Sequence, residues 1–264
     1  MTDVVSAGEV RDASPPRRLF GGIGSLFLRL WMGSWALLGA LSAQAGETSV
    51  LLQDISGVWW ASTYSPKIEP VGGGQLPFTA AGKAAYDLNI AGLREGTIID
   101  TARRYCVPDG VPRILATPYP FEILQTRGQT TILHELNHVV RVVAMDRPLP
   151  ALEDLVAYPY YSGHSVGHWD GDTLVVETTG FNEKTFLDAT GAPHTDQLKT
   201  TERIRKINGG RQLEDIVTVH DPVTFTRDWS ARFVYDQRTD IRLQDYVCGE
   251  KHRDISSVKG VPAR

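Results

Sequence analysis

The chain has 264 residues, of which 42% are hydrophobic and 22% are charged, a composition typical of a protein that buries a core rather than of a disordered chain. The formal net charge is −4, and lysine and arginine form no block or stripe, so neither nucleic acid nor a membrane surface is an expected partner. The 15 prolines and 25 glycines lie between short apolar runs, and no long polar linker divides the chain, which predicts one globular domain.

The N-terminal segment has the pattern of a cleavable signal peptide. Basic residues precede an apolar run at 30–41, and Ala43 and Ala45 follow at the spacing that signal peptidase accepts. A run of about a dozen residues is shorter than the roughly 20 needed to cross a bilayer, so cleavage is favoured over an anchor, and no stable membrane insertion is expected. We therefore expect a signal peptide at 1–45, a single β-rich domain at 46–264, and a periplasmic or secreted location.

Cys106 and Cys248 are the two cysteines of the sequence. Export would bring them into an oxidising compartment, where a disulfide persists, so we expect a bridge between them. The alternative is two buried thiols that act as small hydrophobic side chains.

The first expected elements of the domain are a strand and a helix. Aromatic and β-branched residues at 57–61 predict the strand. Thr79 is a good N-cap for the helix formers at 80–88, and Gly92 is expected to stop the helix. The stretch 107–120 carries four prolines and is expected to be irregular.

From residue 121 onward, apolar runs alternate with turns. Asp170-Gly171 and Asn208-Gly209 predict tight hairpins because these residues tolerate positive φ. The expected strands of this part are 121–126, 130–136, 139–145, 165–169, 173–179, 198–206, 213–220, 229–235 and 241–248. About nine or ten strands in sequential hairpins predict a mainly β fold, an antiparallel meander closed as a barrel or a strongly curved sheet, lipocalin-like, with one short N-terminal helix.

The segment from His134 to His138 reads H-E-x-x-H, the pattern that binds zinc when it lies on a helix. Threonine, isoleucine and valine residues on both sides favour a strand or hairpin instead. On a straight strand the two histidines would lie ~13 Å apart, too far for one tetrahedral zinc. No metal site is therefore expected here.

The segment from Gly163 to Gly167 reads G-x-S-x-G around Ser165. It lies between expected strands rather than at a strand-to-helix turn, so we interpret the match as a coincidence. His164, at the mouth of a strand, is expected to reach a pocket. His168 and the neighbouring aspartates are expected to serve the hairpin.

A loop of about 18 residues follows Phe181, longer than a hairpin needs, and such loops are often functional. Asp188, His194 and Asp196 in this loop, with Glu202 after it, could supply a paired acid and base. The alternative is that these side chains cap turns and carry solvated charge.

Several motifs of the mature chain resemble those of a large group of exported bacterial β-rich proteins. The motifs are Gly163-His164-Ser165, Trp169-Asp170-Gly171-Asp172, Thr179-Gly180-Phe181-Asn182, His194-Thr195-Asp196, Thr201-Glu202-Arg203 and Tyr246-Val247-Cys248. The resemblance covers nearly the whole mature chain but implies no reaction. It favours His164, His194 and Glu202 as site residues, because His134 and His168 are usually other residues in that group.

Three functions are consistent with these patterns. The first is a cofactor-independent isomerase, cyclase or lyase that acts on a hydrophobic small molecule in a pocket inside the barrel. Its candidate catalytic groups are His164, His194, Asp188, Asp196 and Glu202, and its candidate substrate contacts are Glu135, Arg141 and Phe181. The second function is a carrier or sensor without turnover, and the third is a metal-dependent hydrolase. No cofactor is expected, because the sequence contains no nucleotide-binding loop.

Overall fold

The computed structural model describes residues 53–155, 160–246 and 248. All of them belong to the compact unit Thr48–Arg264. The predicted signal peptide lies outside the described residues.

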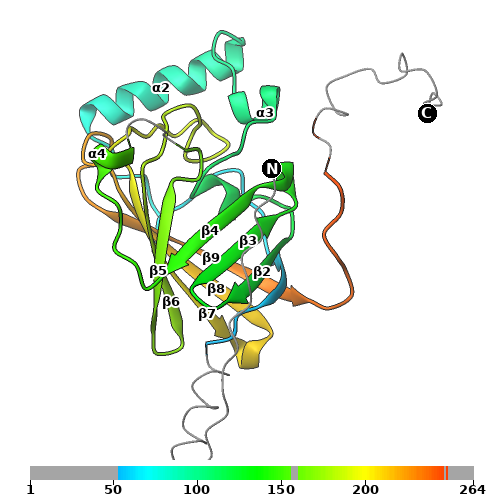
Figure 1. The fold of residues 1–264 in the computed structure, drawn as a ribbon. Coiled ribbons are helices and arrows are strands. Elements are labelled where there is room, and N and C mark those ends of the chain that lie inside the picture. The colour runs from blue at the N-terminus through cyan, green and yellow to red at the C-terminus, as the bar shows by residue number, and fades with distance from the viewer. Residues whose placement is uncertain (1–52, 156–159, 247, 249–264) are drawn as a thin grey trace, which may run out of the picture. The chain divides into compact units, whose positions relative to one another are not determined.

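The described residues form a closed barrel of nine strands in chain order, as predicted, with β9 pairing with β1 (Figure 1). The strands are β1 (Gly57–Ala61), β2 (Phe121–Thr126), β3 (Gln129–His134), β4 (Val140–Met145), β5 (His164–Asp170), β6 (Thr173–Thr179), β7 (Lys199–Ile207), β8 (Gln212–His220) and β9 (Trp229–Arg238). The helices are α2 (Ala80–Glu95), α3 (Thr101–Tyr105) and α4 (Leu152–Leu155), and short 3-10 turns are η1 (Arg113–Ala116), η2 (Leu136–His138) and η3 (Asn208–Gly210). Because the barrel is closed, each of these strands pairs with a neighbour on both sides over at least part of its length.

Two predicted features of the strand order are corrected. β4 and β5 run parallel and pair only between Val143–Met145 and Ser165–Gly167, because the connection between them is long enough to cross over and re-enter in the same direction. The described residues of the expected strand 241–248, which are 241–246 and 248, do not form a strand. The edge of β9 that this strand would have joined is taken by β1, from Val58↔Arg238 to Ala61↔Tyr235.

The helix α2 begins where predicted and ends later. Thr79 Oγ1 accepts the N–H of Gly82 at 3.0 Å, which is the predicted N-cap. The helix continues through Gly92 to Glu95, and Gly96 ends it with φ 76° while its N–H bonds to the Gly92 carbonyl. The αL position that ends the helix is taken by Gly96, while Gly92 lies inside the helix and leaves room for Ile98, whose side chain a Cβ would meet at 2.5 Å.

The barrel interior is filled in three layers. One apolar cluster, which includes Leu198, Val217 and Trp229, lies at one end, and a second, which includes Trp59 and Leu213, lies toward the other. Charged side chains lie between the two clusters. The inward positions along β4, β7 and β8, counted from the residue before β4 and before β7, run Val139–Arg141–Val143, Leu198–Thr200–Glu202–Ile204 and Leu213–Asp215–Val217.

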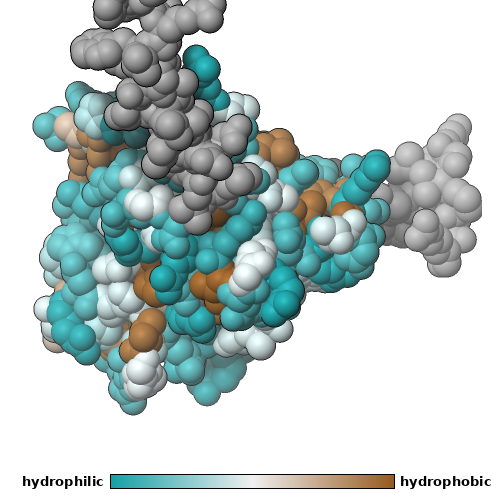
Figure 2. Space-filling view, turned by 90° about the horizontal axis from the view of Figure 1, so that it is seen from below, coloured by the Kyte–Doolittle hydropathy of each residue, from teal (hydrophilic) through white to brown (hydrophobic). Residues whose placement is uncertain are grey.

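The predicted disulfide is present between Cys106 and Cys248. Among the described residues, none of the helices is long and apolar enough to cross a membrane. Figure 2, which views the molecule from below Figure 1, shows a mostly hydrophilic face with small, separate apolar patches.

Candidate ligand-binding site

A cavity of about 730 Å³ lies where β4 and β5 separate. Only the second half of β4 pairs with β5, so its first half has β3 on one side and the cavity on the other. The long connection between β4 and β5 covers the opening with Pro148, Pro150 and residues 160–163. The cavity thus lies on the outer face of the barrel, not inside it as predicted, because the interior is filled by packed side chains.

The cavity is lined mainly by apolar side chains. Val140 and Val142 alternate with the inward Arg141, so they face outward, and they remain 59% and 46% exposed. Tyr160, on the covering segment, is 49% exposed. Large apolar side chains that line a hollow and stay exposed mark a place where an apolar partner gains free energy by binding.

His164 is the predicted catalytic group that borders this cavity. It begins β5 and its ring lies edge-on to the Tyr160 ring, with 4.4 Å between the ring centroids. Burial lowers the pKa of His164, which favours the neutral imidazole at neutral pH. Its Nε2 is buried and has no hydrogen-bond partner among the described residues.

Arg141 and Glu202 form an ion pair inside the barrel, beneath the cavity. The two side chains are 2% and 0% exposed, and the guanidinium donates to both carboxylate oxygens of Glu202. Arg141 also donates to Ser165 Oγ at 3.1 Å and to Thr178 Oγ1 at 2.9 Å. Ser165 therefore serves to hold Arg141, in agreement with the interpretation of its G-x-S-x-G match as a coincidence.

Three further titratable groups surround this pair. Burial and the neighbouring carboxylate of Glu202 raise the pKa of Asp215 well above its usual range, which favours its protonated form. Burial, and to a smaller extent the positive charge of Arg141, lowers the pKa of His134 to about 3. Burial raises the pKa of Tyr235, whose hydroxyl donates to the Leu115 carbonyl at 2.9 Å. The interior is thus a low-dielectric site with one compensated ion pair.

The long loop after Phe181 is held together by its own polar groups. Asp188 is 1% exposed and accepts hydrogen bonds from the backbone N–H groups of Ile68, Thr190 and Ala192. This arrangement matches the alternative in which loop carboxylates cap turns. Neither Asp188 nor the other two loop candidates borders the cavity between β4 and β5.

The remaining candidates lie in separate places. His194 Nδ1 lies 3.2 Å from the Thr195 carbonyl. Burial lowers the pKa of His194, whereas the hydrogen bond to Thr195 and the charge of Asp221 act in the opposite direction. Asp196 is exposed and accepts from Gln197. Phe181 is 2% exposed in the apolar core, and Glu135 accepts the backbone N–H of Gln244. The structure therefore brings together Arg141 and Glu202, with His164 on the other face of β5, but not the loop residues.

The H-E-x-x-H segment adopts the strand-and-turn form that was expected. His134 ends β3 and points inward against Phe121, while His138 lies on η2 and is exposed. The two imidazoles therefore face different surroundings. Among the described residues, no group of three His, Cys, Asp or Glu side chains could hold a metal ion.

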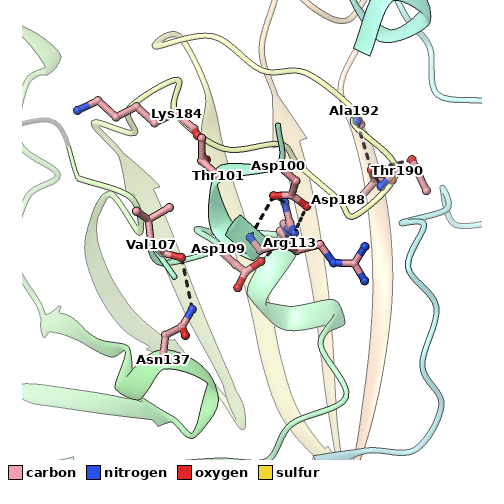
Figure 3. Close-up of polar contacts among 11 residues, drawn as sticks. Asp100, Thr101, Val107, Asp109, Arg113, Asn137, Lys184, Asp188, Thr190 and Ala192 are labelled. Atoms are coloured by element: carbon pink, nitrogen blue, oxygen red, sulfur yellow. Dashed lines mark hydrogen bonds and ion pairs between the residues drawn. The ribbon is translucent and has the colours of Figure 1, made fainter. Parts of the chain in front are cut away.

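A second buried polar cluster lies outside the barrel (Figure 3). Arg113 of η1 donates to both carboxylate oxygens of Asp100 at 3.0 and 2.7 Å, and its Nε lies 2.6 Å from Asp109. Burial raises the pKa of Asp109, although Arg113 opposes the shift. Arg113 and Asp109 border a smaller cavity of about 340 Å³, next to Cys248. Because Arg113 joins the start of α3 to η1, this cluster acts as a structural clamp.

Several interior residues were not predicted as site residues, although the sequence contains a signal for them. Asp215 interrupts an otherwise apolar inward row on β8, as Arg141 does on β4. A charged residue at an inward position of a strand predicts a buried partner, because an isolated buried charge is costly. The partner itself could not be identified from this pattern.

No protein-family model matches the sequence, and a search of curated proteins found no matching relative. The function of this chain is therefore inferred from the geometry of the cavity.

Proposed function

We propose that the protein is an exported binding protein, a carrier or sensor, for a small and largely apolar molecule. The observation that carries the proposal is the cavity of about 730 Å³ beside β4 and β5, with the exposed Val140 and Val142 in its wall. Its volume lies in the range of about 300–1,000 Å³ of small-molecule sites. The ligand would cover apolar surface that the fold itself leaves open to water.

Binding is better supported than acid–base turnover. A general acid and a general base must both come within hydrogen-bond reach of the substrate. Of the five predicted catalytic groups, His164 borders the cavity, whereas Glu202 is fully buried and bonded to Arg141. The neutral imidazole of His164 fits a polar contact to a bound ligand better than it fits one half of an acid–base pair.

The test uses the neutral fluorescent probe N-phenyl-1-naphthylamine. Replacement of Val142 by Asp (V142D) places a charge in the wall and should weaken probe binding by at least about tenfold, because the probe then loses apolar contact and desolvates a carboxylate. Leu124→Asp is the matched control, since Leu124 is 42% exposed on the strand β2 and does not border the cavity. Equal affinity in both variants would contradict the proposal.

Export is the other part of the proposal, supported by the signal-peptide pattern and by the disulfide. Expression of the full chain in a bacterium with a periplasm should release a protein that begins at Gly46. Intact-mass measurement of the periplasmic fraction checks this. Recovery of the full-length chain in the cytosol would contradict it.

A further inference from the structure

Among the described residues, the charged side chains that border the ligand-binding cavity are arginines. The described residues that border it include Arg141, Arg147, His138 and His164, and no aspartate or glutamate. This is unusual for a chain whose acidic residues outnumber its basic ones, 31 to 27. The wall therefore combines apolar side chains with cationic and hydrogen-bonding groups.

The uncompensated charge belongs to Arg147. Arg141 is neutralised by Glu202 in the barrel interior, so it offers little net charge to a ligand. Arg147 follows β4 and is exposed, and among the described residues its guanidinium has neither an ion pair nor a hydrogen bond. A guanidinium beside an apolar wall presents five donors to a carboxylate, sulfonate or phosphate group.

His138 adds a second donor at the cavity. The backbone N–H of Tyr246 donates to His138 Nε2 at 2.9 Å, so this nitrogen is unprotonated. In the neutral ring the proton must then lie on Nδ1, which makes Nδ1 a hydrogen-bond donor. His138 precedes β4 and Arg147 follows it, so the two groups border different ends of the cavity, and each offers a donor to an acceptor on the ligand.

We propose that the ligand is a small organic acid, with an apolar body against Val140 and Val142 and an anionic group at Arg147. This inference rests on the proposed binding function and adds the charge of the ligand to it. An anionic group satisfies Arg147 without burying it, and the valines then cover the body of the molecule. A neutral ligand would leave the guanidinium without an ionic partner.

The experiment compares two probes that share a skeleton. 8-Anilino-1-naphthalenesulfonate carries a sulfonate, and N-phenyl-1-naphthylamine lacks it. Fluorescence titration of the mature protein should show tighter binding of the sulfonate, and Arg147→Gln should weaken that binding about threefold to fivefold, as expected for a partly exposed ion pair. The same substitution should change the affinity of the neutral probe by less than about twofold. Arg211→Gln, in the turn between β7 and β8, is the control and should change neither affinity.

The outcomes separate the two proposals. Loss of the sulfonate preference in Arg147→Gln, together with weaker sulfonate binding at high salt, supports the acidic ligand. If both probes bind with equal affinity, bind more weakly to V142D and bind Arg147→Gln as tightly as the wild type, the cavity binds apolar molecules regardless of their charge. In that case the inference of an acidic ligand is wrong, while the proposed binding function stands. If neither probe responds to V142D, the proposed function fails. Sedimentation with phosphatidylglycerol vesicles, without sulfonate binding in solution, would overturn the inference in favour of a membrane lipid.

Discussion

At the scale of single residues, the buried pair of Arg141 and Glu202 decides how the barrel interior tolerates charge. Each partner offsets the cost of burying the other, and Ser165 and Thr178 accept two further hydrogen bonds from the guanidinium. The pair does not need to stabilise the fold relative to an apolar core. It does make each partner dependent on the other.

We predict that Arg141→Met destabilises the protein by about 3–5 kcal/mol, because it leaves Glu202 as an uncompensated buried carboxylate. The double variant R141M/E202Q should lose less than R141M alone, since it removes the stranded charge. Urea unfolding at pH 7 measures both free energies. Additive losses in the double variant would show that the two side chains do not depend on each other.

We predict that the titration of His134 lowers the free energy of unfolding in acid. Its pKa is about 3 in the folded protein, below the ordinary value of 6.5 that applies when the chain unfolds. The unfolded state therefore binds a proton first as the pH falls, so this contribution is complete above pH 6.5 and decreases between pH 6.5 and about 3. At about 1.4 kcal/mol per pH unit, the loss from this group is about 2 kcal/mol at pH 5.

His134→Leu removes the titration while filling a similar volume. The free energy of unfolding, measured in urea at pH 7.5 and pH 5, should fall less in this variant than in the wild type, by about 2 kcal/mol. The difference between the two proteins isolates His134 from the other groups that titrate in this range. Parallel pH profiles would mean that the imidazole is protonated inside the barrel.

At the scale of elements, α2 is attached to the barrel by close backbone contact. Thr79 N–H donates to the Thr224 carbonyl at 2.9 Å, and Thr79 Oγ1 donates to the Val223 carbonyl at 2.7 Å. A Cβ on Gly82 would lie 2.2 Å from the Thr224 carbonyl oxygen. Glycine at this position therefore sets how closely the first turn of the helix approaches the turn between β8 and β9.

We predict that Gly82→Ala destabilises the protein by about 1–3 kcal/mol through overpacking, although alanine is the better helix former by about 1 kcal/mol. Ala84→Gly, at an exposed position of the same helix, shows the effect of propensity alone and should cost about 1 kcal/mol. Thermal unfolding of both variants makes the comparison. A more stable Gly82→Ala protein would show that the helix can move away from Thr224.

At the scale of the whole molecule, the disulfide joins the residue after α3 to the last described residue. Cys106 and Cys248 are 142 positions apart, so the bridge closes most of the described chain into one loop. Closing a loop of this size removes entropy from the unfolded chain and stabilises the fold by up to about 5 kcal/mol. The double variant C106A/C248A should lose stability on that scale, and a urea midpoint equal to that of the oxidised wild type would contradict this prediction.

The local features of this protein follow from its sequence. The positive φ of Asp-Gly and Asn-Gly turns, the cap at Thr79 and the period-two alternation of apolar residues act over a few positions, so the hairpin β5–β6, the hairpin β7–β8 and the start of α2 were predicted correctly. The closed barrel followed from the number of such hairpins.

The tertiary structure alone decided where the ligand-binding cavity lies. The parallel pairing of β4 with β5 depends on the path of a long connection, and that pairing leaves Val140 and Val142 exposed. The tertiary structure also decided that Glu202 forms an ion pair with Arg141 rather than contacting His194. Strand register and barrel closure decide which charged side chains meet across a barrel. Both depend on residues that lie far apart in the chain, so no local pattern of the sequence predicts these partners.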